Sequence, residues 1–224
     1  DDPTRILRAV RYAARYGFQL EVETARLLQR DLAHLGAISG DRIRNELERY
    51  FMEPDPGRAL CLAQNMGVLR SVHPEIVVLE QAISALSDNS FVTLLPRHLV
   101  VLALLAYSTD DVLGIVDRLG LVGPRASAVS QVPCVRARYD DLESESILGS
   151  RIADMMDPLD DAAIEACSLV LSDGVVRNRL ILYLNELRHV SPALDGSDLL
   201  ALGVPMGPQI GEMLRRLRTG RLDG

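Results

Sequence analysis

Apolar residues recur at intervals of three and four positions along nearly the whole chain, the spacing that gives a helix one buried face. Prolines and glycines interrupt this pattern repeatedly, and no stretch alternates in the way a half-buried strand does. The sequence therefore predicts an all-α protein. The expected helices cover residues 3–16, 21–33, 39–51, 58–65, 76–86, 95–107, 110–119, 123–132, 146–156, 159–171, 175–190, 196–202 and 208–218.

Composition fixes the kind of core that these helices can share. Hydrophobic residues make up 48% of the 224 residues but aromatic residues only 4%, so the core must be aliphatic. The cysteines Cys61, Cys134 and Cys167 are isolated, with no zinc-type spacing, and fit a reducing compartment. No signal peptide and no apolar run of bilayer length is apparent. We therefore expect a cytoplasmic protein with no membrane partner.

The distribution of charge decides where nucleic acid could bind. All 24 basic residues are arginine, and the formal net charge is −7, so the chain as a whole does not suit a polyanion. Acids dominate residues 140–165, whereas residues 206–224 are net basic and residues 1–58 are balanced. Any RNA contact is therefore expected at the two ends of the chain.

The first helix carries the strongest functional pattern. At about 100° per residue, Arg5, Arg8, Arg11 and Arg15 fall on one side of the helix and the apolar residues on the other. Like charges at this spacing repel, so carboxylates or phosphates must offset them. Asp2 lies one turn before Arg5, and the two side chains together form a donor–acceptor edge suited to a nucleobase. A solvated arginine face paired with nearby acids is the alternative.

The segment DDPTRILRAVRYAARYGF at the start of the chain closely resembles the EDxxR-xxR-xxRF…GF segment of class II tRNA nucleotidyltransferases and bacterial poly(A) polymerases. In that family the segment is a protein template that selects ATP or CTP. The resemblance implies that Asp2 and Arg5 pair with the base, while Arg8 and Arg11 complete the nucleotide site. Asp1 stands where the family often has Glu, and would orient Arg5 less firmly.

The resemblance continues over the first third of the chain. Residues 39–47 (SGDRIRNEL) are similar to the family element S-x-E-R-I-x-x-E-L, and Ser39 is expected to cap its helix. Residues 55–75 contain elements similar to DPxRAL, GLL and xPE. Arg42 and Arg44 invite the hypothesis of phosphate contacts, with an exposed helix face paired to nearby glutamates as the alternative.

A second resembling segment lies near the other end. Residues 194–211 are similar to the family's tail motif G-x-D-L-x-x-L-G-x-x-x-G-P-x-I-G, which reads as helix, glycine-rich turn, helix. Backbone N–H groups next to Gly207 could bind an anion. Arg215, Arg216 and Arg218 follow and would contact an RNA backbone whatever its sequence. A helical hairpin with a solvated arginine end is the alternative.

The residues that carry the family's catalysis are not recognised in the sequence. Its head domain has a glycine-rich phosphate loop and a D-x-D metal site, and neither pattern occurs here. The paired acids at 110–111, 140–141 and 160–161 are explained by helix starts. We expect no catalytic residue and no metal ligand in this chain, with Mg²⁺ held by a head domain outside it and the chain inactive alone.

The resemblance implies three parts: a neck over residues 1–74, a helical body over residues 75–190 and a tail over residues 191–224. The expected function is selection of ATP or CTP as substrate and positioning of tRNA for nucleotide addition to its 3′ end. The alternatives are a standalone helical RNA-binding or scaffold protein and a fragment of a poly(A) polymerase. Which nucleotides are added, and the oligomeric state, are left open.

Overall fold

The computed structural model describes residues 2–87, 93 and 95–224, and every regular element in these residues is a helix. The all-α prediction is therefore confirmed for the described part of the chain. The helices are α1 (Thr4–Tyr16), α2 (Val22–Asp31), the 3₁₀ helix η1 (Leu32–Ala37), α3 (Gly40–Phe51), α4 (Pro56–Asn65), α5 (Val68–Val72), α6 (Glu80–Ser87), α7 (Arg97–Leu105), α8 (Val112–Leu119), α9 (Pro124–Ser130), α10 (Val132–Arg136), α11 (Tyr139–Glu143), α12 (Gly149–Met156), α13 (Asp161–Val170), α14 (Val175–Asn185), the 3₁₀ helix η2 (Leu187–His189), α15 (Gly196–Ala201) and α16 (Pro208–Leu222).

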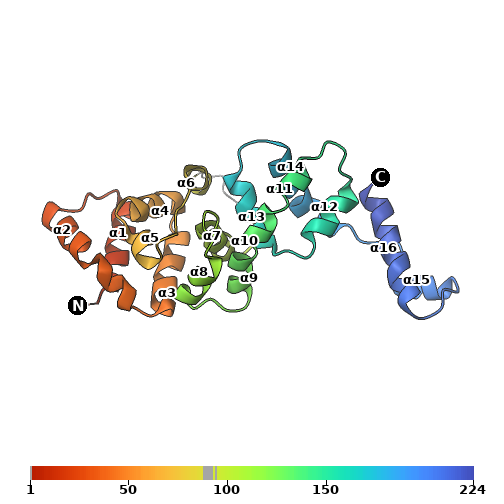
Figure 1. Cartoon of the computed structure of the whole chain (residues 1–224), viewed down its shortest axis with the longest axis horizontal. Coiled ribbons are helices and arrows are strands. Elements are labelled where there is room, and N and C mark those ends of the chain that lie inside the picture. The colour runs from red at the N-terminus through yellow and green to blue at the C-terminus, as the bar shows by residue number, and fades with distance from the viewer. Residues whose placement is uncertain (1, 88–92, 94) are drawn as a thin grey trace.

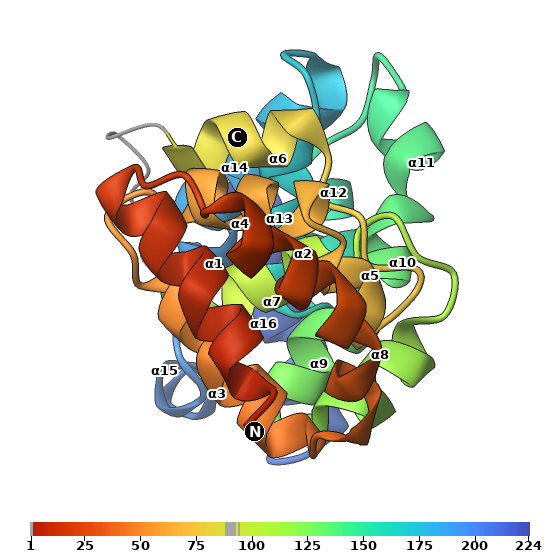
Figure 2. The ribbon, with the colours of Figure 1, turned by 90° about the vertical axis from the view of Figure 1, so that its left-hand side faces the viewer.

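The helices follow one another along an elongated molecule (Figure 1). Helices α1 to α5 form one end, α7 to α10 the middle and α11 to α14 the next section, while α15 and α16 project at the far end. Seen end-on, α1 and α2 lie at the front, nearest the viewer (Figure 2). None of the helices in the described residues has both the length and the apolarity needed to cross a bilayer.

One aliphatic core runs through most of this length. Buried residues from Ile6 on α1 to Leu187 on η2 form a single contiguous cluster, with α7 and α13 packed together near its centre. Burial of apolar surface on this scale is the main force that holds short helices in place, because helices of five to ten residues are marginal alone. The expected boundary near residue 74 stays a prediction, since this core lies on both sides of it.

Polar contacts also connect the helices on the two sides of residue 74. The Arg118 guanidinium on α8 donates hydrogen bonds to the carbonyl oxygens of Leu35, Ile38 and Val72 at 2.7, 3.0 and 3.0 Å. Each of these carbonyls lies at or near the end of a helix, and that of Leu35 also accepts from the Ile38 backbone N–H. One side chain on α8 therefore fixes η1, the start of α3 and α5 relative to one another.

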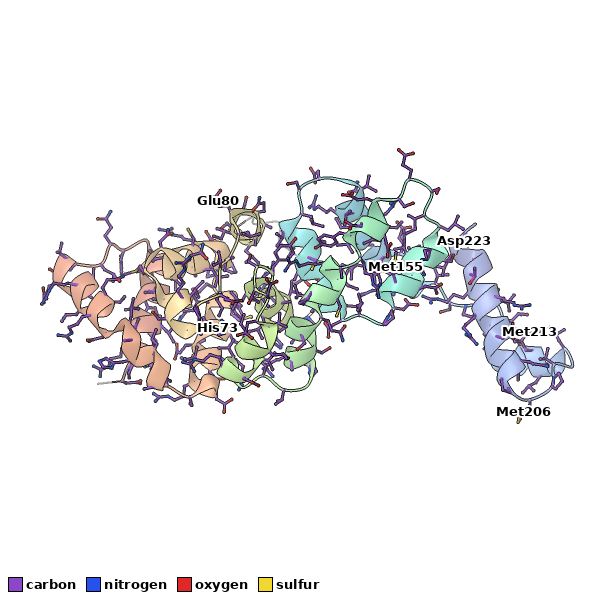
Figure 3. The ribbon with its side chains drawn as sticks, in the orientation of Figure 1. His73, Glu80, Met155, Met206, Met213 and Asp223 are labelled. Atoms are coloured by element: carbon purple, nitrogen blue, oxygen red, sulfur yellow. The ribbon has the colours of Figure 1, made fainter. Side chains whose placement is uncertain are left out.

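The last two helices, α15 and α16, contribute no residue to this buried core cluster. Within the described chain, α16 has no buried residue, and Leu199 on α15 is buried but lies outside the main core. The body end of α16 is fastened by Asp223, which accepts from the Ser150 backbone N–H at 2.8 Å and from its hydroxyl at 2.9 Å. Figure 3 shows Asp223 at that end of α16 and Met206 at the far tip.

Several expectations about helix limits need correction. Helix α6 begins at Glu80 and not at Ile76, and the five-residue helix α5 was not among the expected helices. Ser39 does occupy the N-cap position of α3, but its side chain makes no capping hydrogen bond. Short helices and caps depend on a few contacts each, so tertiary packing readily moves their ends.

Candidate functional site

Helix α1 has one face in the core and one toward solvent. Leu7 and Val10 are fully buried, and the Tyr50 hydroxyl on α3 donates to the Leu7 carbonyl at 2.5 Å. Burial raises the pKa of Tyr50, so this hydrogen bond keeps its proton at physiological pH. Arg5 and Arg15 lie on the opposite, exposed face. The helix is therefore fixed on α3 with its arginine side turned outward.

Asp2 holds the start of this helix. Its carboxylate accepts from the Thr4 backbone N–H at 3.0 Å and from the Thr4 hydroxyl at 2.8 Å, which caps α1. Arg42 on α3 donates to it at 2.8 Å and Arg8 at 3.5 Å. The hydrogen bonds from Thr4, with the nearby arginines, lower the pKa of Asp2. The carboxylate is thus ionised at neutral pH, and its two oxygens are shared among Thr4, Arg8 and Arg42.

A groove of about 810 Å³ lies between α1 and the pair α2–η1. Asp2 and Arg5, the two residues expected to read a base, both line it. Arg30 and His34 line its other side and add polar groups, while Ile6, Ala9, Leu27 and Leu28 supply an apolar surface. The structure therefore brings the predicted pair to one concave surface. Asp1, expected to orient Arg5, lies outside the described residues.

Two buried glutamates outside α1 hold its arginines in place. Glu46 on α3, 5% exposed, accepts from Arg8 at 3.1 Å and from Arg49 at 2.7 Å. Glu53, 4% exposed, accepts from Arg11 at 2.7 Å and lies 3.4 Å from Arg15. Carboxylates thus offset the repulsion within the arginine row. Sequence reasoning missed this role for both glutamates.

Arg11 departs from the expectation of four outward-facing guanidinium groups. Its side chain is 7% exposed and packs against Glu53 in the interior. Burial, the largest single effect, lowers the pKa of Arg11, but the hydrogen bonds and charges of Glu53 and Tyr12 together outweigh it, so the pKa is raised. Arg11 is therefore fixed between α1 and α3, whereas Arg8 is half-exposed and Arg5 and Arg15 face solvent. A direct contact between Arg11 and a nucleotide remains a prediction.

The two arginines of α3 have different surroundings. Arg42 is exposed and pairs with Asp2, so it lies beside the groove. Arg44 turns the other way and donates to the carbonyl oxygens of Leu119 and Gly120 at 3.1 and 2.8 Å. Those carbonyls end α8, so Arg44 caps that helix. The phosphate contacts expected of Arg42 and Arg44 both stay predictions.

The tail arginines also divide into two groups. Arg218 donates to the Val190 carbonyl at 2.9 Å and pairs with Asp157, which ties α16 to the body. Arg215 and Arg216 lie on the exposed surface of α16, where Arg216 pairs with Glu212 one turn earlier at 2.6 Å. Gly207, at φ 155°, precedes the helix start at Pro208. Arg215 and Arg216 are thus exposed to a polyanion, whereas Arg218 is occupied in holding α16 to the body.

No group of three or more His, Cys, Asp or Glu side chains in the described residues is arranged to hold a metal ion. These residues do not fit the Mg²⁺ that the resemblance implies, so no step is assigned to a metal here.

Comparison with known proteins connects this geometry to a family. Residues 17–79 match the family described as the probable RNA and SrmB-binding site of polymerase A. The whole chain aligns, at 25% identity, with the A-adding tRNA nucleotidyltransferase of Geobacter sulfurreducens. The resemblance to the tRNA nucleotidyltransferases is confirmed. The multifunctional CCA protein of Neisseria gonorrhoeae is 36% identical over 78 residues, 34% of this chain.

Solved structures of CCA-adding enzymes have the same fold. The Thermotoga maritima CCA-adding enzyme in complex with tRNA matches the whole chain with a TM-score of 0.79 at 24% identity, over 58% of its own length. A CCA-adding enzyme in complex with CTP matches equally, over 56% of its length. The chain spans 28% of the Geobacter relative and 19% of the Neisseria one.

Proposed function

We propose that this chain is the nucleotide-selecting and tRNA-positioning part of a tRNA nucleotidyltransferase, acting in the transfer of AMP or CMP from ATP or CTP to a tRNA 3′ end, with release of pyrophosphate. The observation that carries the proposal is the placement of Asp2 and Arg5 together on the groove beside α1. An ionised carboxylate and a guanidinium on one groove offer both acceptors and donors to a base edge. Apolar residues of the groove would cover the face of the base.

The remaining arginines suit the charged parts of the substrates. Arg8 and Arg15 lie along the same side of α1, held by Glu46 and Glu53, and would be near a triphosphate or an RNA phosphate. Holding guanidinium groups in fixed positions before binding lowers the entropy cost of recognition. Arg42 extends this basic border from α3. Chemistry at the 3′ hydroxyl is assigned to residues outside those described.

The first test measures binding of each of the four nucleoside triphosphates to the chain by calorimetry. ATP and CTP are expected to bind more tightly than GTP and UTP, because only their base edges match the order of donor and acceptor on Arg5 and Asp2. Arg5→Ala should abolish the preference. Arg26→Ala is the matched control, since Arg26 is exposed and pairs with Glu23 away from the groove. Equal binding of all four would refute base selection by this chain.

The second test measures tRNA binding over a salt series. A salt slope is expected, and Arg215→Ala with Arg216→Ala should reduce it, because the slope grows with the number of phosphates that the protein neutralises. Binding of tRNA with no nucleotide preference would favour a helical RNA-binding scaffold. Equal affinity for tRNA and for unstructured RNA would favour a poly(A) polymerase. Absence of binding even at low salt would refute the RNA-positioning role.

A further inference from the structure

Three aromatic side chains form an exposed ladder at the end of α1. The rings of Tyr12 and Tyr16 stack with centroids 6.3 Å apart and planes 26° apart, and those of Tyr16 and Phe18 with centroids 5.4 Å and planes 28° apart. Gly17 between them adopts a left-handed conformation, φ 69°, and the Phe18 N–H bonds back to the Ala13 carbonyl at 3.0 Å. This turn places Phe18 next to Tyr16 and so extends the ladder beyond the helix.

The ladder is unusual in a chain that has few aromatic residues. Tyr12, Tyr16 and Phe18 are 44%, 58% and 66% exposed, whereas Tyr50 and Phe51 are fully buried in the core. An exposed Phe leaves a large apolar surface in water, and clustered exposed apolar surface marks a binding site more often than isolated residues do. The three rings therefore form a surface that gains free energy when it is covered.

Positive charge surrounds these rings. The Arg11 guanidinium lies 4.5 Å from the centre of the Tyr12 ring, and that of Arg15 lies 5.8 Å from the centre of the Tyr16 ring. An Arg58 terminal nitrogen comes within 3.3 Å of the place where a Gly17 Cβ would be. Arg11 is buried on Glu53, so Arg15 and Arg58 are the exposed guanidinium groups beside the rings. Exposed aromatic faces next to such groups suit single-stranded nucleic acid, through base stacking and phosphate contacts.

The ladder also has a defined relation to the proposed nucleotide site. Tyr12 and Tyr16 follow Arg5 by seven and eleven residues on the same side of α1, so they lie about 10 and 16 Å farther along the helix. Stacked nucleotides rise about 3.4 Å each, so the nearer distance corresponds to about three nucleotides. A strand whose growing end lies at Arg5 would therefore bring about its third unpaired nucleotide to Tyr12, the first ring of the ladder.

We propose that Tyr12, Tyr16 and Phe18 form a stacking platform for unpaired bases of the RNA that precede its growing 3′ end. This inference rests on the proposed function and adds a binding site for the acceptor strand to it. Phe18 is the most exposed ring and ends the ladder among the described residues, so its removal takes away the largest exposed aromatic face. RNA is favoured over a protein partner because the Arg15 guanidinium lies beside the Tyr16 ring and that of Arg58 beside Gly17.

The test measures the affinity of the 224-residue chain for two forms of one tRNA. One form has the single-stranded CCA end and the other lacks it. Phe18→Leu and Tyr16→Leu remove a ring but keep an apolar side chain, and Phe18→Tyr keeps the ring. Val22→Ala is the control, because Val22 is an apolar residue that is 82% exposed and has no ring to stack on a base. A 2-aminopurine base within the single-stranded end reports stacking through quenching of its fluorescence.

The chain is expected to bind the CCA-ended tRNA more tightly and to quench the 2-aminopurine. Loss of the Phe18 ring should weaken binding of that form about five- to 100-fold and abolish quenching, with no effect on the trimmed tRNA. Phe18→Tyr and Val22→Ala should match the wild type.

Equal binding of the two tRNA forms, unchanged by ring removal, would overturn the platform while tRNA positioning stands. A change in self-association without a change in RNA affinity would also overturn it and would identify a protein interface. If neither tRNA binds, the proposed function fails and the platform with it.

Discussion

Replacing Glu53 by glutamine should destabilise the protein strongly, although Glu53 lies at no recognised functional position. Glu53 is 4% exposed and holds Arg11, which is 7% exposed, at 2.7 Å. Glutamine has nearly the same shape but no charge, so the Arg11 guanidinium would stay buried without a counter-ion. Removing one member of a buried ion pair costs about 3–5 kcal/mol. For a chain of this size that corresponds to a fall in Tm of about 6–20 °C.

Urea denaturation followed by far-ultraviolet circular dichroism measures this change. Glu23→Gln is the matched control, because Glu23 forms an exposed pair with Arg26 and its replacement should leave the midpoint unchanged. The double variant Arg11→Met with Glu53→Leu replaces the pair by apolar side chains and should recover most of the lost stability. An unchanged midpoint for Glu53→Gln would refute the reasoning, since it would mean that the Arg11 charge reaches water.

Three further outcomes are expected. Arg44→Ala should cost about 1.5–3 kcal/mol, because it removes charged hydrogen bonds to two carbonyl oxygens, and should leave the salt dependence of tRNA binding unchanged; a smaller salt slope would contradict its structural role. Burial raises the pKa of Glu165, so the protonated side chain stabilises the fold at low pH. This stabilisation is lost as pH rises through the raised pKa. Glu165→Gln should therefore be more stable than wild type at pH 7 but not below pH about 4, as thermal denaturation would show. Asp223→Ala should speed amide hydrogen exchange in α16 with no change in α13. An equal change in both helices would disprove that α16 is held to the body by its own contacts.

Local signals in the sequence were enough to predict α1. Asp2, Pro3 and Gly17 act within a turn of the helix ends, so their effect can be read without knowledge of the fold. Helices α5, α10 and α11 have five residues each, too few for a periodic pattern, and depend on packing. Their existence could not be predicted from local signals.

The main residues of the candidate site could be predicted, but the contacts that support them could not. Asp2 and Arg5 follow from a short motif, and the structure places both on one groove. The partners of the arginines lie far away in sequence: Glu46 is 38 residues from Arg8, and Glu53 is 42 from Arg11. Pairings at such separations depend on how helices pack, and a single sequence holds no direct record of that.

The joint between α16 and the body has a mechanical consequence. Arg218 is the attachment nearest the tip, and the ten residues from Pro208 to Arg218 rise about 15 Å, so the tip near Met206 stands at least that far from it. Leu222, which packs against the core, and the bonds of Asp223 hold the same end of the helix. A turn of about 10° at this attachment would move the tip by about 3 Å, given that length. The tail is thus a lever arm, which enlarges at its tip any small rotation at its attachment.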